Sequence, residues 1–336
     1  MNALLLVVML TAAQPPQQFG PNNIAPTAAE VELGRELFFE TLLSQDGTVS
    51  CATCHDPAKG WADGLPLAVG IRGQVGTRHS PTIINAAYSP LMFWDGRAVG
   101  TDTQSLLPLS NPIEMGNQSE ADVLTKLRLS PRYVRAFTSV YGSIDLQSLS
   151  PITGPRLARA IAAFETTVVS FNAPIDRRLD GDVNALTPDA EVGFQLFQQA
   201  NCMACHTPPL FTDGLMHNNG MEYAGKLLAR GQQYDEGRAA ILRERRIRPT
   251  TADVRAFKTP TLREIHRTAP YNHAGNFADL DRVVLHYATG GKRFDETVDR
   301  YIDPRVQAVR FLEWTPSRMQ YLRIFLETAF AGSPAP

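Results

Sequence analysis

The sequence lacks several features that mark common classes of function. Its net charge is only −2 and it has no long basic run, which argues against a nucleic-acid partner. Beyond the N-terminus no apolar stretch approaches about 18 residues, so no transmembrane span is expected in the mature chain. Strand-like alternation is scarce, whereas 43% apolar and 20% charged residues are typical of a folded soluble protein. We therefore expect a mostly α-helical chain, long enough for two domains.

The N-terminus holds the one pronounced apolar run, from Ala3 to Leu10, and small residues follow it up to Ala13. This run is too short to span a bilayer but suits the apolar part of a secretory signal. No Lys or Arg precedes it, which leaves a membrane anchor or a wrong start codon as alternatives. We predict that residues 1–13 are a cleaved signal peptide, that 14–26 form a flexible segment, and that the protein is periplasmic.

Cysteine is also scarce, and all four residues lie in two C-x-x-C-H motifs, "CATCH" at 51–55 and "CMACH" at 202–206. Such a motif could form a zinc half-site, a disulfide or a haem attachment site. A C-x-x-C disulfide closes too small a loop to staple a domain of this size. Paired zinc motifs usually lie about 15 to 20 residues apart, whereas these lie in different halves of the chain.

Covalent haem attachment explains both the thiols and the histidines. Each pair of cysteines would bond to the vinyl groups of one haem, and the adjacent histidine would become the proximal iron ligand. The sequence therefore predicts two haem c groups. The residues that would hold them are Cys51, Cys54 and His55 for the first group, and Cys202, Cys205 and His206 for the second.

A short internal repeat precedes both motifs. The pattern Gly-x-x-Leu-Phe occurs at 34–38 and again at 193–197, each time within a stretch of helical periodicity. Thr27 and Thr187 are the predicted caps of these two helices. We expect an N-terminal unit at 27–170, which the C-terminal helix at 315–330 could complete, and a C-terminal unit at 171–314.

Several separated motifs resemble the bacterial di-haem cytochrome c peroxidases and their MauG-type relatives. They are "GRELFFETLLSQDGTVSCATCHDPAKGWADG", "SPTIINAAYSPLMFWDGRA", "NPIEMG", "FKTPTLREIHRTAPYNHAGNF" and "LHYATGG". The resemblance runs from about Ala29 to Ala329. It implies two tandem cytochrome-c-like haem domains with long loops, in which one haem reacts with hydrogen peroxide and the other relays electrons.

The resemblance also implies roles for residues around the first haem. Glu114 of "NPIEMG" would be the acid–base group above the reactive haem, because a carboxyl in a closed pocket has a raised pKa. Gln104 would hydrogen-bond to bound peroxide. Trp94 would lie between the haems and carry an oxidising equivalent from one to the other. Without the motifs, Glu114 would be interpreted as a solvated loop residue and Trp94 as a core aromatic.

Arg97 and Arg263 are candidate partners of the haem propionates, because a guanidinium group matches the geometry of a carboxylate. Ion pairs between the two domains are the alternative for both. On the second haem the position of the family's distal ligand corresponds to Tyr287, in "LHYATGG". A phenolate there favours ferric and higher iron states. Candidates that could replace Tyr287 are His286, Met216 and Met221.

Two positions depart from the family pattern. Counting back from Ser80, the place of the distal histidine of the classical peroxidases is held by Ile71, which cannot bind iron. We therefore predict a first haem with no second protein ligand. His79 stands where the family has a calcium-binding asparagine. Calcium prefers oxygen ligands, so calcium at the matching Thr268 and Pro270 carbonyls is doubtful.

The leading hypothesis is an exported di-haem peroxidase that reduces hydrogen peroxide with electrons from a small periplasmic cytochrome c or copper protein. A MauG-type enzyme that oxidises a partner protein or another substrate is the first alternative. A non-catalytic di-haem electron carrier is the second, and it requires two protein ligands at both irons.

Overall fold

The computed structural model describes residues 25–142, 150–221, 234–292 and 298–332. The predicted signal peptide at 1–13 therefore lies outside the described residues. Helices joined by long loops and short 3-10 turns dominate the described chain, so the prediction of a mostly helical fold is confirmed. Among the described residues no helix is both long and apolar enough to cross a bilayer.

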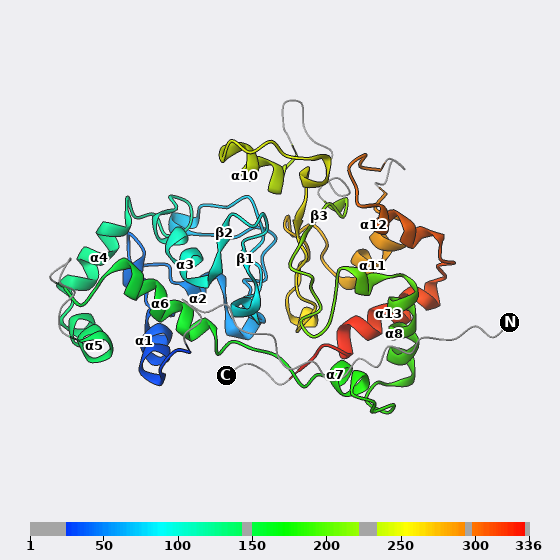
Figure 1. Ribbon diagram of the computed structural model, residues 1–336, viewed down its shortest axis with the longest axis horizontal. Helices are drawn as coiled ribbons and strands as arrows, with labels where there is room; N and C mark the ends of the chain where they lie inside the picture. Colours follow the sequence, from blue (N-terminus) through cyan, green and yellow to red (C-terminus); the bar gives the residue numbers. More distant parts are fainter. Residues whose placement is uncertain (1–24, 143–149, 222–233, 293–297, 333–336) are drawn as a thin grey trace.

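The N-terminal unit lies on one side of the molecule in Figure 1. A cluster of buried apolar side chains, including Leu37, Phe38 and Ile161, forms its core. Its helices are α1 (Ala28–Phe38), α2 (Cys51–Cys54), α3 (Gly100–Ser110), α4 (Glu120–Leu129), α5 (Pro131–Tyr141) and α6 (Gly154–Glu165). A two-stranded antiparallel ribbon of β1 (Leu91–Met92) and β2 (Ala98–Val99) faces the other unit (Figure 1).

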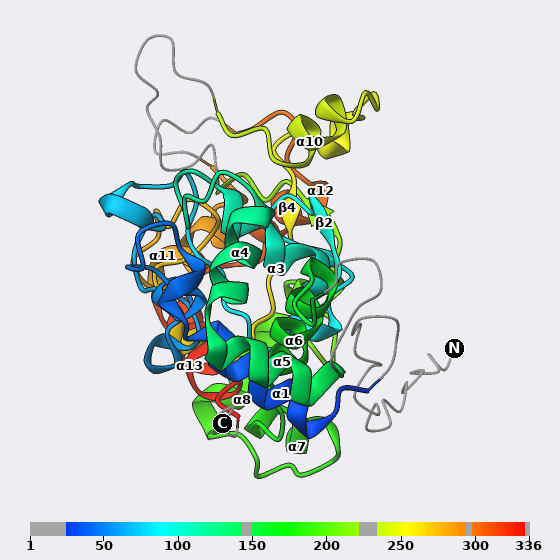
Figure 2. The ribbon, with the colours of Figure 1, turned by 90° about the vertical axis from the view of Figure 1, so that its left-hand side faces the viewer.

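The C-terminal unit has its own core, which includes Phe194, Phe197 and Phe325. Its helices are α7 (Pro174–Leu179), α8 (Pro188–Gln199), α10 (Arg238–Glu244), α11 (Leu280–Ala288), α12 (Pro304–Ala308) and α13 (Pro316–Thr328). Strand β3 (Met216–His217) pairs antiparallel with β4 (Phe257–Lys258). In both views α10 lies at the opposite end of the molecule from α1 and α8 (Figure 2).

The predicted repeat forms the same helix crossing in both units. The Thr27 side chain caps α1 in a capping box with Glu30, and the Thr187 side chain caps α8, as predicted. Gly34 of α1 lies so close to α6 that an added Cβ would overlap the carbonyl oxygen of Ala160. Gly193 of α8 lies equally close to α13, against the carbonyl oxygen of Tyr321. Glycine thus permits the close approach of two helices in each unit.

This crossing corrects the expectation for the C-terminal helix. Helix α13 packs along α8, and its Phe325 and Leu326 lie in the core of the C-terminal unit. In the N-terminal unit the corresponding packing partner of α1 is α6, so α13 is not required there. The helix at 315–330 therefore completes the second unit and not the first.

Candidate functional site

Both C-x-x-C-H motifs line one cavity of about 880 Å³ between and within the two units. The wall at the boundary comes from the β1–β2 ribbon and the segment before it on one side, and from β4 and the loop after it on the other. Two backbone hydrogen bonds join these walls. The His79 N–H donates to the His273 carbonyl oxygen at 2.8 Å, and the Lys258 N–H donates to the Trp94 carbonyl oxygen at 2.7 Å.

The two motif histidines have the same environment. The Nδ1 atom of His55 lies 3.2 Å from the carbonyl oxygen of Trp61, and Nδ1 of His206 lies 3.0 Å from that of Phe211. A carbonyl only accepts hydrogen bonds, so Nδ1 carries the hydrogen and Nε2 keeps its lone pair. Burial lowers the pKa of both imidazoles, which favours the neutral form that a metal requires.

The repeat phenylalanines pack against these histidines. The ring centroids of Phe38 and His55 are 6.4 Å apart, and those of Phe197 and His206 are also 6.4 Å apart. Phe38 and Phe197 lie one helical turn after the glycines at the helix crossings, so each helix contacts both its partner helix and the motif histidine.

The four cysteines are free thiols, so neither motif forms a disulfide. Burial raises the pKa of Cys51 and Cys202 to about 12 and that of Cys54 to about 11, which keeps these thiols protonated. Each motif thus presents two thiols and an imidazole lone pair along the cavity, and this donor set fits haem c.

Glu114 and Gln104 line the cavity together with the first motif. The Asn111 side chain donates a hydrogen bond to Oε1 of Glu114 at 2.7 Å. Burial raises the pKa of Glu114, and the charge of Arg97 opposes this shift. A carboxyl with a raised pKa keeps its proton to higher pH than an exposed one, which suits it to acid–base chemistry.

Ile71 lies in the core of the N-terminal unit and does not line the cavity. Its backbone N–H donates to the carbonyl oxygen of Glu114 at 2.8 Å. The position that resembles the distal histidine therefore packs into the core and also holds the loop that carries Glu114.

Trp94 is buried at the boundary between the units and lines the cavity. Its indole Nε1–H donates to the carbonyl oxygen of His79 at 2.8 Å, and its ring lies edge-on to His273 at 6.3 Å. Contacts from both units thus hold the indole in one orientation.

Of the two predicted propionate partners, only Arg97 lines the cavity. Its Nη1 atom lies 2.9 Å from Asp95, and its guanidinium group covers the Phe93 ring. Arg263 is fully buried outside the cavity lining. It forms two hydrogen bonds to Asp176, at 2.5 and 2.6 Å, and also donates to the Pro209 carbonyl oxygen. The expectation for Arg263 is therefore corrected: it forms an ion pair within the C-terminal unit.

Tyr287 of α11 lines the cavity, as its place in the helix predicted. The Asn219 side chain lies 3.4 Å from its hydroxyl oxygen, and burial raises the pKa of Tyr287 to about 12. His286 points elsewhere, because its Nε2 lies 2.8 Å from the Asn219 carbonyl oxygen. Of the two alternative methionines, Met221 lines the cavity and Met216 does not.

The residues expected at a calcium site do not make a suitable donor set. Thr268 and Pro270 line the cavity. The imidazole of buried His79, however, uses Nδ1 to donate to the Leu65 carbonyl oxygen at 2.7 Å. Calcium requires about six to eight oxygen ligands, and an imidazole does not replace one. Calcium at the Thr268 and Pro270 carbonyls therefore stays a doubtful prediction from the sequence.

The ionisable residues that line the cavity and had no role predicted from the sequence include Lys258 and Glu165. Lys258 lies within one of the motifs that carry the family resemblance. Glu165 is the one acidic residue in the apolar second half of α6. An acidic residue in an otherwise apolar helical stretch is visible in the sequence and could have marked Glu165 as a candidate site residue.

The chain was also compared with known proteins. A family model described as "Di-haem cytochrome c peroxidase" matches residues 28–184. The methylamine utilization protein MauG of Methylorubrum extorquens is 39% identical over 80% of this chain and 70% of its own length. The cytochrome-c peroxidase IdrP2 of Denitromonas iodatirespirans is 36% identical over 82% of this chain and 78% of its own length.

A similar solved structure is a MauG-like protein associated with microbial copper homeostasis. It has a TM-score of 0.78 and 26% identity, and the likeness covers 94% of this chain and 93% of that chain. The diheme peroxidase BthA of Burkholderia thailandensis, at 24% identity and a TM-score of 0.75, shares the fold over 90% of this chain and 86% of its own. The chain therefore belongs to the di-haem cytochrome c peroxidase family, whose MauG and peroxidase members are oxidoreductases.

Proposed function

We propose that this protein is an exported di-haem c-type peroxidase of the MauG-like kind, working in the periplasm. Hydrogen peroxide would be reduced on the side of the N-terminal motif, and the oxidising equivalents would be shared with the C-terminal haem. The observation that carries the proposal is Glu114, which lines the same cavity as His55 and has a pKa raised by burial.

When bound, the haem irons supply the redox chemistry. The protein's own part in cleaving the O–O bond is to move a proton from one peroxide oxygen to the other. Glu114 is suited to this transfer because burial raises its pKa and so favours the protonated form that can donate to a peroxide oxygen. Asn111 positions its carboxyl group. Gln104 can donate a hydrogen bond to peroxide from the same cavity wall.

The remaining residues divide the two haem sites into different roles. His55 and His206 would be the proximal ligands, and Arg97 would pair with a propionate. Ile71 supplies no ligand, so the first iron would keep one face for the oxidant. Tyr287 would bind the second iron and favour its higher oxidation states. Trp94, held between the units, would carry oxidising equivalents between the two sites.

A second candidate function is the oxidation of a partner protein or another substrate, as an alternative to accepting electrons from a small cytochrome c or copper protein. Tyr287 favours this candidate, because an anionic oxygen ligand helps the second site to retain an oxidising equivalent. The relative named MauG at 39% identity also supports it. Both candidates use the same peroxide site.

Electron paramagnetic resonance (EPR) of the oxidised protein at low temperature, before and after stoichiometric peroxide, tests the proposal. We expect one high-spin and one low-spin ferric signal, both altered by peroxide. In the matched variant Glu114→Gln both signals should be present but should respond much more slowly. Two low-spin signals that are indifferent to peroxide would mean that the protein is a non-catalytic electron carrier.

A further inference from the structure

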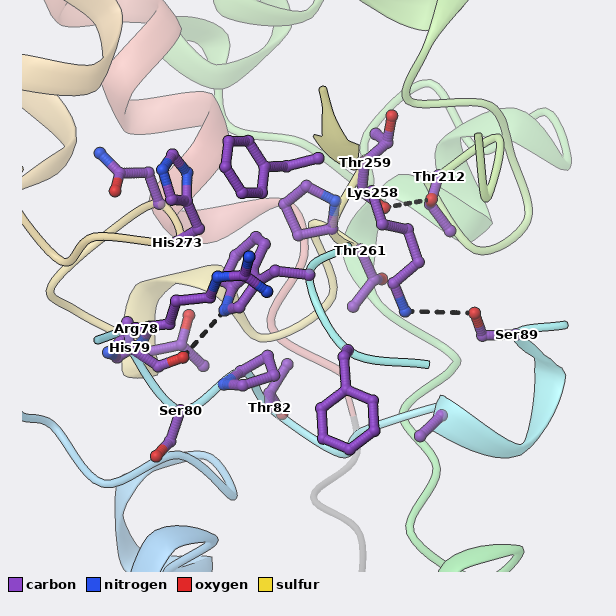
Figure 3. Close-up of a pocket in the computed structure, with 18 of the residues that line it drawn as sticks. Arg78, His79, Ser80, Thr82, Ser89, Thr212, Lys258, Thr259, Thr261 and His273 are labelled. Carbon is purple, nitrogen blue, oxygen red and sulfur yellow. Dashed lines mark hydrogen bonds between the residues drawn. The ribbon is translucent and has the colours of Figure 1, made fainter. Parts of the chain in front are cut away.

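Lys258 spans the boundary between the two units. It ends strand β4, where its backbone pairs with Met216 of the C-terminal unit. Its side chain, however, reaches the N-terminal unit. The ammonium group donates to Ser89 Oγ at 3.2 Å (Figure 3) and to the Leu91 carbonyl oxygen at 3.0 Å. Because its backbone N–H donates to Trp94, the lysine is also a direct neighbour of that residue.

The described residues do not provide a hydrogen-bond acceptor for every N–H of this ammonium group. An ammonium has three N–H donors, and its described partners are two uncharged oxygens. Across the described ranges no carboxylate lies within ion-pair distance of Lys258. Burial lowers the pKa of Lys258 to about 8, with no opposing negative charge. A desolvated cation is normally paired, so an anion inside the cavity would stabilise the charged form of Lys258.

Other cations of the cavity wall differ from Lys258 in this respect. Arg78 pairs with Asp95 and with Asp235 of the other unit, and Arg305 pairs with Asp303. Their charges are already balanced by protein carboxylates. Lys258 is therefore a cation of this wall without a protein carboxylate of its own, and haem c brings two propionate carboxylates into the cavity.

We propose that Lys258 binds a haem propionate at the boundary between the units, beside Trp94. The pair would fix the haem edge close to the indole. It would also balance a positive charge that otherwise makes removal of an electron from Trp94 harder. Lys258 would thus be a positioning residue for electron transfer between the haems. The proposal rests on the two haem groups of the family and not on the peroxide reaction.

Reduction potentials measured by spectroelectrochemistry without peroxide test this pairing. In Lys258→Met the propionate loses its counter-ion, which stabilises the ferric form, so the potential of one haem should fall. Lys258→Arg should restore most of it. The control is Lys126→Met, which removes the same charge from α4, outside the cavity lining. Equal potentials in Lys258→Met and Lys126→Met would overturn the proposal.

The wild-type protein gives a second test that does not depend on the folding of a variant. A propionate belongs to a covalently attached group and cannot be exchanged. The potentials should therefore not change when inorganic phosphate replaces chloride at constant ionic strength. A specific shift with phosphate would mean that Lys258 binds an exchangeable anion, which would refute the propionate assignment. Both measurements can be interpreted even if the protein shows no peroxidase activity, because neither of them uses peroxide.

Discussion

Replacing Glu165 with glutamine should flatten the pH dependence of stability between mildly acidic and mildly alkaline pH. Glu165 ends α6, its residue is 4% exposed, and its Oε2 atom has no hydrogen-bond partner in the described structure. Burial raises its pKa from 4.5 to about 8. Between these values the folded protein keeps a proton that the unfolded chain releases.

The sign and size of the effect follow from this difference. The stabilising contribution of the neutral carboxyl is fully present below pH 4.5 and is lost as the pH rises through about 8. Each pH unit within this window corresponds to about 1.4 kcal/mol, so the free energy of unfolding should fall by a few kcal/mol across it. Glutamine has the same shape but does not titrate.

The assay is guanidinium unfolding of the haem-loaded protein, followed by circular dichroism at several pH values from about 5 to about 8. The control is Glu32→Gln at an exposed position of α1. A hydrogen bond from Arg35 lowers the pKa of Glu32, so this carboxyl stays ionised throughout the window. The wild type and the control should lose stability in parallel, and Glu165→Gln should lose less. Parallel curves for all three proteins would refute the reasoning.

Three further predictions concern the haem sites and the helix crossing. Glu114→Gln should lower the rate of peroxide turnover by about 10²–10⁴-fold at unchanged haem content, because the proton carrier is lost; a loss below about tenfold would contradict its role. Tyr287→His should keep the haem content but change the low-spin EPR signal, and an unchanged spectrum would mean that the tyrosine is not a ligand. Gly193→Val should destabilise the protein by at least about 1–3 kcal/mol, because its Cβ would overlap the Tyr321 carbonyl oxygen. The exposed change Gln198→Ala on the same helix is the control, and equal unfolding midpoints would contradict the crossing.

The sequence allowed much of the fold to be predicted, because local signals determine it. Two C-x-x-C-H motifs, two capping threonines and a repeated Gly-x-x-Leu-Phe pattern identify two similar helical units. Local signals do not show which other helix each helix packs against. The apolar face of the segment at 315–330 predicts a buried helix, but it does not say which core receives that face. The crossing of α13 with α8 decides this in three dimensions.

The same limit applies to charged side chains. Arg263 was predicted to face a propionate, but its carboxylate partner, Asp176, lies 87 positions away in the sequence. No sequence pattern around either residue predicts that ion pair. Lys258 and Glu165 were missed for a related reason. The importance of Lys258 comes from desolvation without a carboxylate partner, and that of Glu165 from burial with Oε2 left without a hydrogen-bond partner in the described structure. Family motifs instead identified Glu114, Gln104, Trp94 and Tyr287 as residues that line the cavity.

The helix that precedes each motif holds the motif histidine independently of the rest of the cavity wall. One face of that helix supplies a glycine for the helix crossing and a phenylalanine for the motif histidine. Glu114 and Tyr287 belong to other segments and take no part in this contact. Reactive groups elsewhere in the cavity wall can therefore be exchanged while the motif histidine keeps its orientation. A duplicated scaffold of this kind can support two unlike metal centres in a single chain.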